Sequence, residues 1–184
     1  MNTPERYHPF LVTLHWLTVL LLFGAGMLSE SGRRSPINIH MIIGALLLLV
    51  MIIRVIVRFT TKSPAWAKTG SPLLDKLGEL VHLGLYLAVF FILGMGGLIA
   101  YNRNLFAYLL DTTATVGRRA GFIGRIHQLG WILAVGLVLL HIGAAFYHQF
   151  IINDNLMARS WYGKRVISEP VHPLINVSPT EDNL

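Results

Sequence analysis

The stretch FIGRIHQLGWILAVGLVLLHIGAAFYHQFII, residues 122–152, decides the fold class. Its ionisable side chains are Arg125 and three histidines, and almost everything else in it is apolar. A helix rising 1.5 Å per residue needs about 20 such residues to cross a bilayer core of about 30 Å. The alternating pattern of a barrel strand is missing, so the stretch predicts a membrane-spanning helix.

Three further stretches of comparable length, at residues 10–28, 37–59 and 77–101, carry the same pattern. The whole chain is 54% apolar and only 13% charged, with a mean hydropathy of +0.58. This composition excludes a disordered chain, a collagen-like fibre and an ordinary soluble enzyme. We expect an all-α membrane protein: one four-helix transmembrane domain over residues 1–160, followed by a polar tail over residues 161–184.

Charge and cysteine content narrow the class further. Without cysteine the chain has no disulfides, thiolate-bound clusters or C-x-x-C-H haem attachment. The net charge of +6 suits a membrane surface, and no motif indicates nucleic-acid binding. With both termini in the cytoplasm, nine basic residues fall inside (Arg6, Arg54, Arg58, Lys62, Lys68, Lys76, Arg159, Lys164, Arg165) and six outside (Arg33, Arg34, Arg103, Arg118, Arg119, Arg125). The positive-inside rule therefore favours this orientation, with the first span retained rather than cleaved.

Histidines at membrane depth are candidate functional residues because ionisable groups are costly there. His127 and His141 are fourteen residues apart, which places them on one helix face about 21 Å apart along the axis. On the first two spans, His15 lies at the expected depth of His141, and His40 lies at the expected depth of His127. The pairs His15–His141 and His40–His127 have the arrangement of bis-imidazole ligands of b-type haems. Small residues on the same face, such as Ala134, either leave room for a macrocycle or serve plain helix packing.

Arginines near these levels are candidate partners for haem propionates. Arg54 and Arg58 follow His40 by fourteen and eighteen residues, which places both on its face near the inner level. Snorkelling to the headgroups is the alternative, with even weight for Arg58. Arg33, Arg34, Arg103 and Arg125 could serve an outer haem.

Two histidines remain toward the inner side. His148 lies one heptad beyond His141 and suits a hydrogen bond to quinone or a proton path from the cytoplasm. His82 could share that role or replace His15 as a ligand. For each, a structural hydrogen-bonding role is an equal alternative. His8 and His172 are expected to be exposed and without a role.

The ordered set of motifs resembles the bacterial di-haem cytochrome b561 family, which includes superoxide:ubiquinone oxidoreductases. The matching pieces span about residues 6–160: Leu14-His15-Trp16, Asn38 to Gly44, Arg54 with Arg58, His82 to Leu87, Tyr101-Asn102-Arg103, His127 to Gly130, His141 to His148 and Asp154-Asn155. The resemblance implies two b haems in a four-helix bundle of the bacterial inner membrane, with His15 and His141 on the inner haem and His40 and His127 on the outer one. It also implies quinone as a substrate.

Three functions follow as hypotheses. The first is a di-haem oxidoreductase that moves electrons from an outer-face donor, such as superoxide, to the quinone pool. Arg125 and the basic outer loop would attract that anion. The second is a membrane-anchor cytochrome subunit that links a dehydrogenase or hydrogenase to quinone. The third is a haem-free transporter or structural protein. Besides lipid and quinone, a redox protein or a second copy of the chain are candidate partners.

Overall fold

The computed structural model describes residues 6–28, 39–65, 67–117, 120–154 and 156–162. Four helices in it are long and apolar enough to cross a membrane: α1 (Pro9–Met27), α2 (Ile39–Thr60), α3 (Pro72–Asn102) and α5 (Gly121–Tyr147), the last continued by a π-helical turn, η1 (His148–Ile152). Two short helices, α4 (Leu105–Leu110) and α6 (Leu156–Arg159), lie in the connections. No strand occurs in these described ranges, and the expected all-α membrane protein is confirmed.

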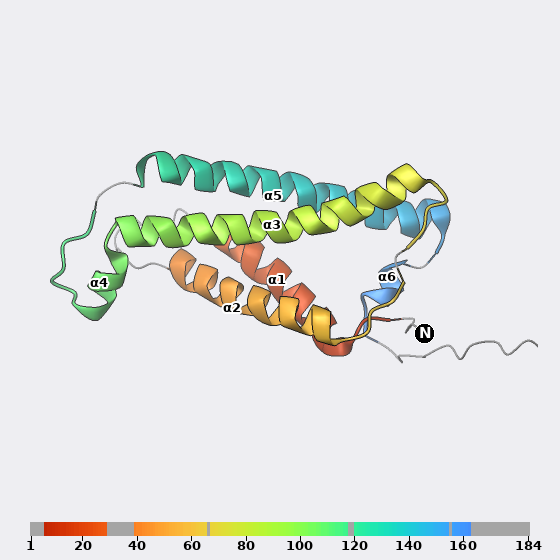
Figure 1. The fold of residues 1–184 in the computed structure, drawn as a ribbon, viewed down its shortest axis with the longest axis horizontal. Helices are drawn as coiled ribbons and strands as arrows, with labels where there is room; N and C mark the ends of the chain where they lie inside the picture. Colours follow the sequence, from red (N-terminus) through yellow and green to blue (C-terminus); the bar gives the residue numbers. More distant parts are fainter. Residues whose placement is uncertain (1–5, 29–38, 66, 118–119, 155, 163–184) are drawn as a thin grey trace, which may run out of the picture.

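The long helices form a bundle of two pairs. α3 packs along α5 and α1 along α2, with further contacts between α2 and α3 (Figure 1). α4 lies at one end of the bundle, and α6 lies at the other end near the N-terminus (Figure 1). Successive long helices therefore run in opposite directions and bring residues far apart in sequence to the same level.

Local signals set the ends of the helices. His8 caps α1 by accepting a hydrogen bond from the backbone N–H of Phe10 at 3.2 Å, and Pro9 follows at the first helical position. Pro72 likewise stands at the first helical position of α3. Asn104 precedes α4 and Asn153 ends η1, both with φ of 59°, a left-handed conformation that asparagine tolerates. The expectation that His8 has no role is therefore wrong, because its ring caps the first span.

The bundle interior contains a cluster from three helices: Leu22 of α1, Leu47 and Met51 of α2, and Val89 of α3. The indole of Trp131 on α5 packs against this cluster. Trp131 also lies over Gly26, where a Cβ atom would be only 2.4 Å from the ring. Gly26 therefore leaves room on α1 for the indole that reaches it from α5, as expected in lipid, where packing replaces the hydrophobic effect between helices.

α3 and α5 meet through small residues. Ala134 is fully buried against Ala88 and Ile92, and a Cβ atom at Gly130 would lie 3.0 Å from the side chain of Ile92. Of the two explanations for the small residues between His127 and His141, the structure supports helix packing for these two. The large apolar side chains elsewhere on the spans are mostly exposed, which is the pattern of a surface that faces lipid.

Candidate functional site

Two imidazoles from different helices meet toward the α4 end of the bundle. The rings of His40 on α2 and His127 on α5 are 6.0 Å apart between centroids and nearly perpendicular, at 84°. Nδ1 of His40 donates to the carbonyl of Ala25 at 2.8 Å, and Nδ1 of His127 donates to the carbonyl of Ile92 at 3.0 Å. Because a carbonyl only accepts, both rings are fixed with the proton on Nδ1 and the lone pair on Nε2. Such an Nε2 is ready to bind a metal, and its ring is oriented by the second nitrogen.

Three imidazoles gather toward the other end. His141 on α5 lies 6.3 Å from His15 on α1 and 4.9 Å from His82 on α3, measured between ring centroids. Nδ1 of His82 donates to the carbonyl of Gly78 at 2.8 Å, so its Nε2 also carries a lone pair. The structure thus brings together the predicted pair and places the alternative ligand beside it.

Arg54 is the cation of this inner group. Its Nη2 donates to Nδ1 of His15 at 3.0 Å, and its guanidinium lies 5.3 Å from the ring centre of Tyr86. Because arginine stays protonated, Nδ1 of His15 accepts this bond and the ring proton sits on Nε2. Coordination through Nε2 of His15 therefore requires Arg54 to turn to another acceptor. Nε of Arg54 is buried and has no hydrogen-bond partner among the described residues, so the guanidinium has donor capacity to spare for a carboxylate.

Arg58, one turn further, bonds to the hydroxyl of Ser63 in the connection to α3. This contact lies at the C-terminal end of α2, which favours the surface alternative over a propionate partner.

The donor set fits haem iron. Metal–nitrogen bonds of about 2 Å place two imidazole centroids on opposite sides of a metal about 6 Å apart. The pairs at 6.0 and 6.3 Å match this spacing, whereas the 4.9 Å between His82 and His141 is shorter. Across the described residues, no three His, Asp or Glu side chains converge as a bare metal ion would need. Two axial nitrogens per iron are what a b-type haem requires.

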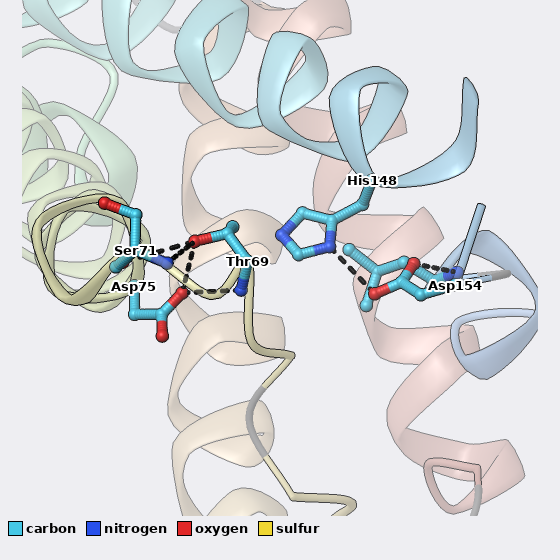
Figure 2. Close-up of polar contacts among 6 residues, drawn as sticks. Thr69, Ser71, Asp75, His148 and Asp154 are labelled. Carbon is cyan, nitrogen blue, oxygen red and sulfur yellow. Dashed lines mark hydrogen bonds and ion pairs between the residues drawn. The ribbon is translucent and has the colours of Figure 1, made fainter. Parts of the chain in front are cut away.

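A polar cluster lies at the inner end, beyond these rings. Nδ1 of His148 contacts Oδ2 of Asp154 at 2.8 Å (Figure 2). On the other side of the ring, Thr69 donates to Oδ1 of Asp75 through its backbone N–H at 2.7 Å and its hydroxyl at 2.6 Å (Figure 2). His148 is thus enclosed by two connections that the sequence could not place side by side.

The outer end carries a closed loop after α3. Nε of Arg103 donates to the carbonyl of Gly117 at 2.9 Å, and Asn104 donates to the carbonyl of Thr115 at 3.1 Å. Hydrogen bonds from Thr113 hold the pKa of Asp111 below its usual value, so this carboxylate stays charged and offsets part of the positive charge.

Of the remaining outer arginines, one lies within the described residues. Arg125 is exposed near the start of α5. Arg33, Arg34, Arg118 and Arg119, and also His172, lie outside the described residues.

Comparison with known proteins identifies the family of the chain. Residues 6–163 match the family described as prokaryotic cytochrome b561. The chain belongs to this family. Its members bind haem b and transfer electrons across membranes, so this cytochrome is a transmembrane electron-transfer protein that contacts the lipid bilayer.

Two curated relatives cover most of the cytochrome. It is 29% identical over 175 residues to cytochrome b561 homolog 2 of Escherichia coli (strain K12), across 86% of this chain and 92% of the relative. It is 23% identical over 173 residues to the probable superoxide oxidase CybB of Yersinia pestis, across 88% and 98%.

Two residues at the site escaped the sequence analysis. Asp154 stood only in a motif, with no partner assigned. Gly96 on α3 lies against the outer ring, because a Cβ atom there would be in van der Waals contact with Cε1 of His127 at 3.4 Å. The proximity of Asp154 to a histidine six residues earlier was the available signal for the first. A glycine facing another helix leaves no comparable signal.

Proposed function

We propose that this cytochrome holds two b haems and carries electrons from superoxide at the outer face to quinone at the inner side. One observation carries the proposal: two imidazole pairs of axial-ligand spacing stand fourteen residues apart on α5. The separation is about 21 Å along the helix, so the pairs lie near opposite sides of a bilayer core.

The residues have distinct roles in this proposal. His40 and His127 hold the outer haem, and His15 and His141 the inner one. Arg54 leaves Nδ1 of His15 for a propionate of the inner haem, which neutralises the carboxylate and frees the His15 tautomer for coordination. When bound, the haems accept and release single electrons. The protein supplies their ligands, spacing and electrostatic surroundings.

Superoxide as donor is supported by the relative from Yersinia pestis that is called a probable superoxide oxidase. The exposed Arg125 stands two residues before His127 and would attract an anion to the outer haem. Two superoxide anions would give two electrons, leaving two molecules of dioxygen, and one quinone would take these electrons with two protons. His148 and His82 lie at the inner end, where they would hydrogen-bond the quinone or supply protons to it.

A membrane-anchor subunit for a dehydrogenase or hydrogenase is the second candidate. The observation that favours it is a set of contacts on α1 beside the inner site. Trp161 packs edge-on against Trp16 at 5.8 Å, and the hydroxyls of Tyr162 and Thr13 are 3.0 Å apart. These contacts hold Trp161 and Tyr162, the first two residues of the polar tail at 161–184, where a partner could dock. Membership in a family that binds haem b disfavours the haem-free hypothesis.

Stopped-flow spectroscopy of the isolated cytochrome tests the proposal. Superoxide should reduce the haems faster than it dismutates spontaneously, and a soluble quinone should reoxidise them. Arg125→Gln should slow reduction by superoxide a few-fold and flatten its dependence on ionic strength, with reduction by dithionite unchanged. Haems that stay oxidised in superoxide, yet are reduced once a dehydrogenase partner is added, would replace the first candidate by the second.

A further inference from the structure

Asp154 and His148 are joined by a hydrogen bond between their side chains at the inner end of α5. The side chain of His148 is only 10% exposed, although it stands at the end of a membrane span. Its Nδ1 contacts Oδ2 of Asp154 at 2.8 Å. A buried ring with one nitrogen committed to a carboxylate has a fixed orientation, which a histidine that merely fills space does not need.

The backbone is shaped to bring this carboxylate back over the ring. α5 widens into the π-helical turn η1 at His148, a type of irregularity that often marks functional sites. Asn153 then takes a left-handed conformation, and the N–H of Asp154 donates to the carbonyl of His148 at 3.3 Å. Oδ1 of Asp154 accepts from the backbone N–H of Leu156 at 3.1 Å. The carboxylate is therefore anchored on both oxygens.

The chemical consequence lies on the opposite edge of the ring. A carboxylate accepts, so Nδ1 of His148 carries the proton and Nε2 carries the lone pair of the neutral ring. Figure 2 shows that the edge away from Asp154 faces the segment of Thr69. The titratable groups near the ring include Asp154 beyond η1, Asp75 at the start of α3 and Tyr147, whose ring centroid lies 6.4 Å away. The hydrogen bonds of Asp75 go to Thr69, and Lys68 lies near the same carboxylate.

We propose that Asp154 is a positioning residue that makes His148 a proton donor to quinone. The carboxylate holds the proton on Nδ1, so each further proton from the inner aqueous phase binds at Nε2. That proton then passes from Nε2 to a quinone oxygen, and the ring returns to its neutral form still bonded to Asp154. Two such transfers and two electrons convert quinone to quinol. This inference rests on quinone being the acceptor, as set out under Proposed function.

Asp154→Asn in the haem-loaded cytochrome tests it, because the amide can turn its NH₂ toward Nδ1 and so favour the other tautomer. We expect both haems to remain and their reduction by dithionite to be unchanged. The kcat for quinone reduction should fall at least about tenfold with little change in KM, because a wrong tautomer impairs proton transfer rather than binding. Asp154→Glu should restore part of the rate.

Asp75→Asn is the matched control. Asp75 belongs to the same polar cluster, but its carboxylate accepts hydrogen bonds from Thr69 and not from the ring of His148. The substitution is isosteric, as at Asp154. It should leave kcat within about twofold of that of the unmodified protein, because substitutions of exposed residues usually have small effects. Equal losses of rate in both variants, or an unchanged rate in Asp154→Asn, would overturn the positioning role.

A second measurement does not depend on any variant being stable. The ¹⁵N shifts of histidine rings in the reduced, unmodified cytochrome report which nitrogen of His148 is protonated. A proton on Nδ1 is the expected result, and a proton on Nε2 alone would refute the inference even if quinone is reduced. Conversely, a cytochrome that never reduces quinone but shows the Nδ1 proton would sink the proposed function and leave the contact itself intact.

Discussion

At the scale of single residues, the partner of each Nδ1 separates the histidines of the spans. His40, His82 and His127 donate from Nδ1 to backbone carbonyls, which leaves Nε2 able to coordinate a metal. His15 instead accepts from Arg54, so its coordination depends on where that guanidinium goes. Chain position alone does not distinguish these cases, since all four histidines are embedded in apolar sequence.

Removing one ligand from each end tests the pairing. His127→Ala should lose mainly the outer haem and His141→Ala mainly the inner one, because each iron would lose one of its two axial nitrogens. Haem content per polypeptide in the purified variants should fall by about half in each case, and the lost α-band component should differ between them. An unchanged content in either variant would contradict the proposed ligands.

The third imidazole of the inner group makes a further comparison decisive. His15→Ala should lose the inner haem, whereas His82→Ala should keep both haems, because only the His15–His141 separation matches that of axial ligands. Haem content and low-temperature electron paramagnetic resonance of the oxidised variants would show this. If His82→Ala loses the haem and His15→Ala keeps it, His82 is the ligand and Arg54 simply pairs with His15.

At the scale of helices, the packing of the bundle depends on glycines that leave room for large side chains of neighbouring helices. The indole of Trp131 occupies the place of a side chain at position 26, so a larger residue there would force the ring or a helix to shift. Gly24 lies two residues earlier on the same helix, and a Cβ atom there would make only an ordinary contact with the side chain of Ile43, at 4.0 Å. The two glycines therefore offer a matched pair.

Gly26→Ala should destabilise the protein by about 1–3 kcal/mol, because the added Cβ forces the indole or a helix to shift. Gly24→Ala should be neutral or slightly stabilising, since alanine has the better helix propensity. Thermal unfolding in detergent, followed by circular dichroism, measures both. Equal midpoints for the two variants would show that the contact with Trp131 does not constrain the bundle.

At the scale of the whole molecule, four crossings place both ends of the bundle's chain on one side of the membrane. The excess of basic residues assigns that side to the cytoplasm of a bacterial inner membrane, which stays a prediction. The division into a domain over residues 1–160 and a tail is likewise a prediction. Trp161 and Tyr162, assigned to the tail, pack on α1.

Reporter fusions test the orientation. A fluorescent protein fused after Leu184 should be bright, because it folds in the cytoplasm, and alkaline phosphatase fused there should be inactive. Phosphatase inserted after Gly117, in the loop between α4 and α5, should be active. The reverse pattern would invert the cytochrome and exchange the proposed outer and inner haems.

The sequence by itself determined the helices and the levels of their histidines. Residue spacing sets both, because an α-helix has a fixed rise and a fixed turn per residue. It could therefore predict four spans near residues 10–28, 37–59, 77–101 and 122–152. It could also predict that His127 and His141 share a face, and the membership in a haem b family was recognised from the ordered motifs.

The sequence predicted the two histidine pairs, but only the tertiary structure decided how each ring is oriented and which other groups meet it across helices. Rotation of each helix about its axis is set by packing between helices, as at Gly26 and Trp131, and lipid imposes no sequence pattern that fixes it. The carbonyls of Ala25 and Ile92 that orient the outer rings belong to the backbone, which every residue shares. The return of Asp154 over His148 depends on a π-helical turn and a left-handed asparagine, both of which are properties of the folded chain.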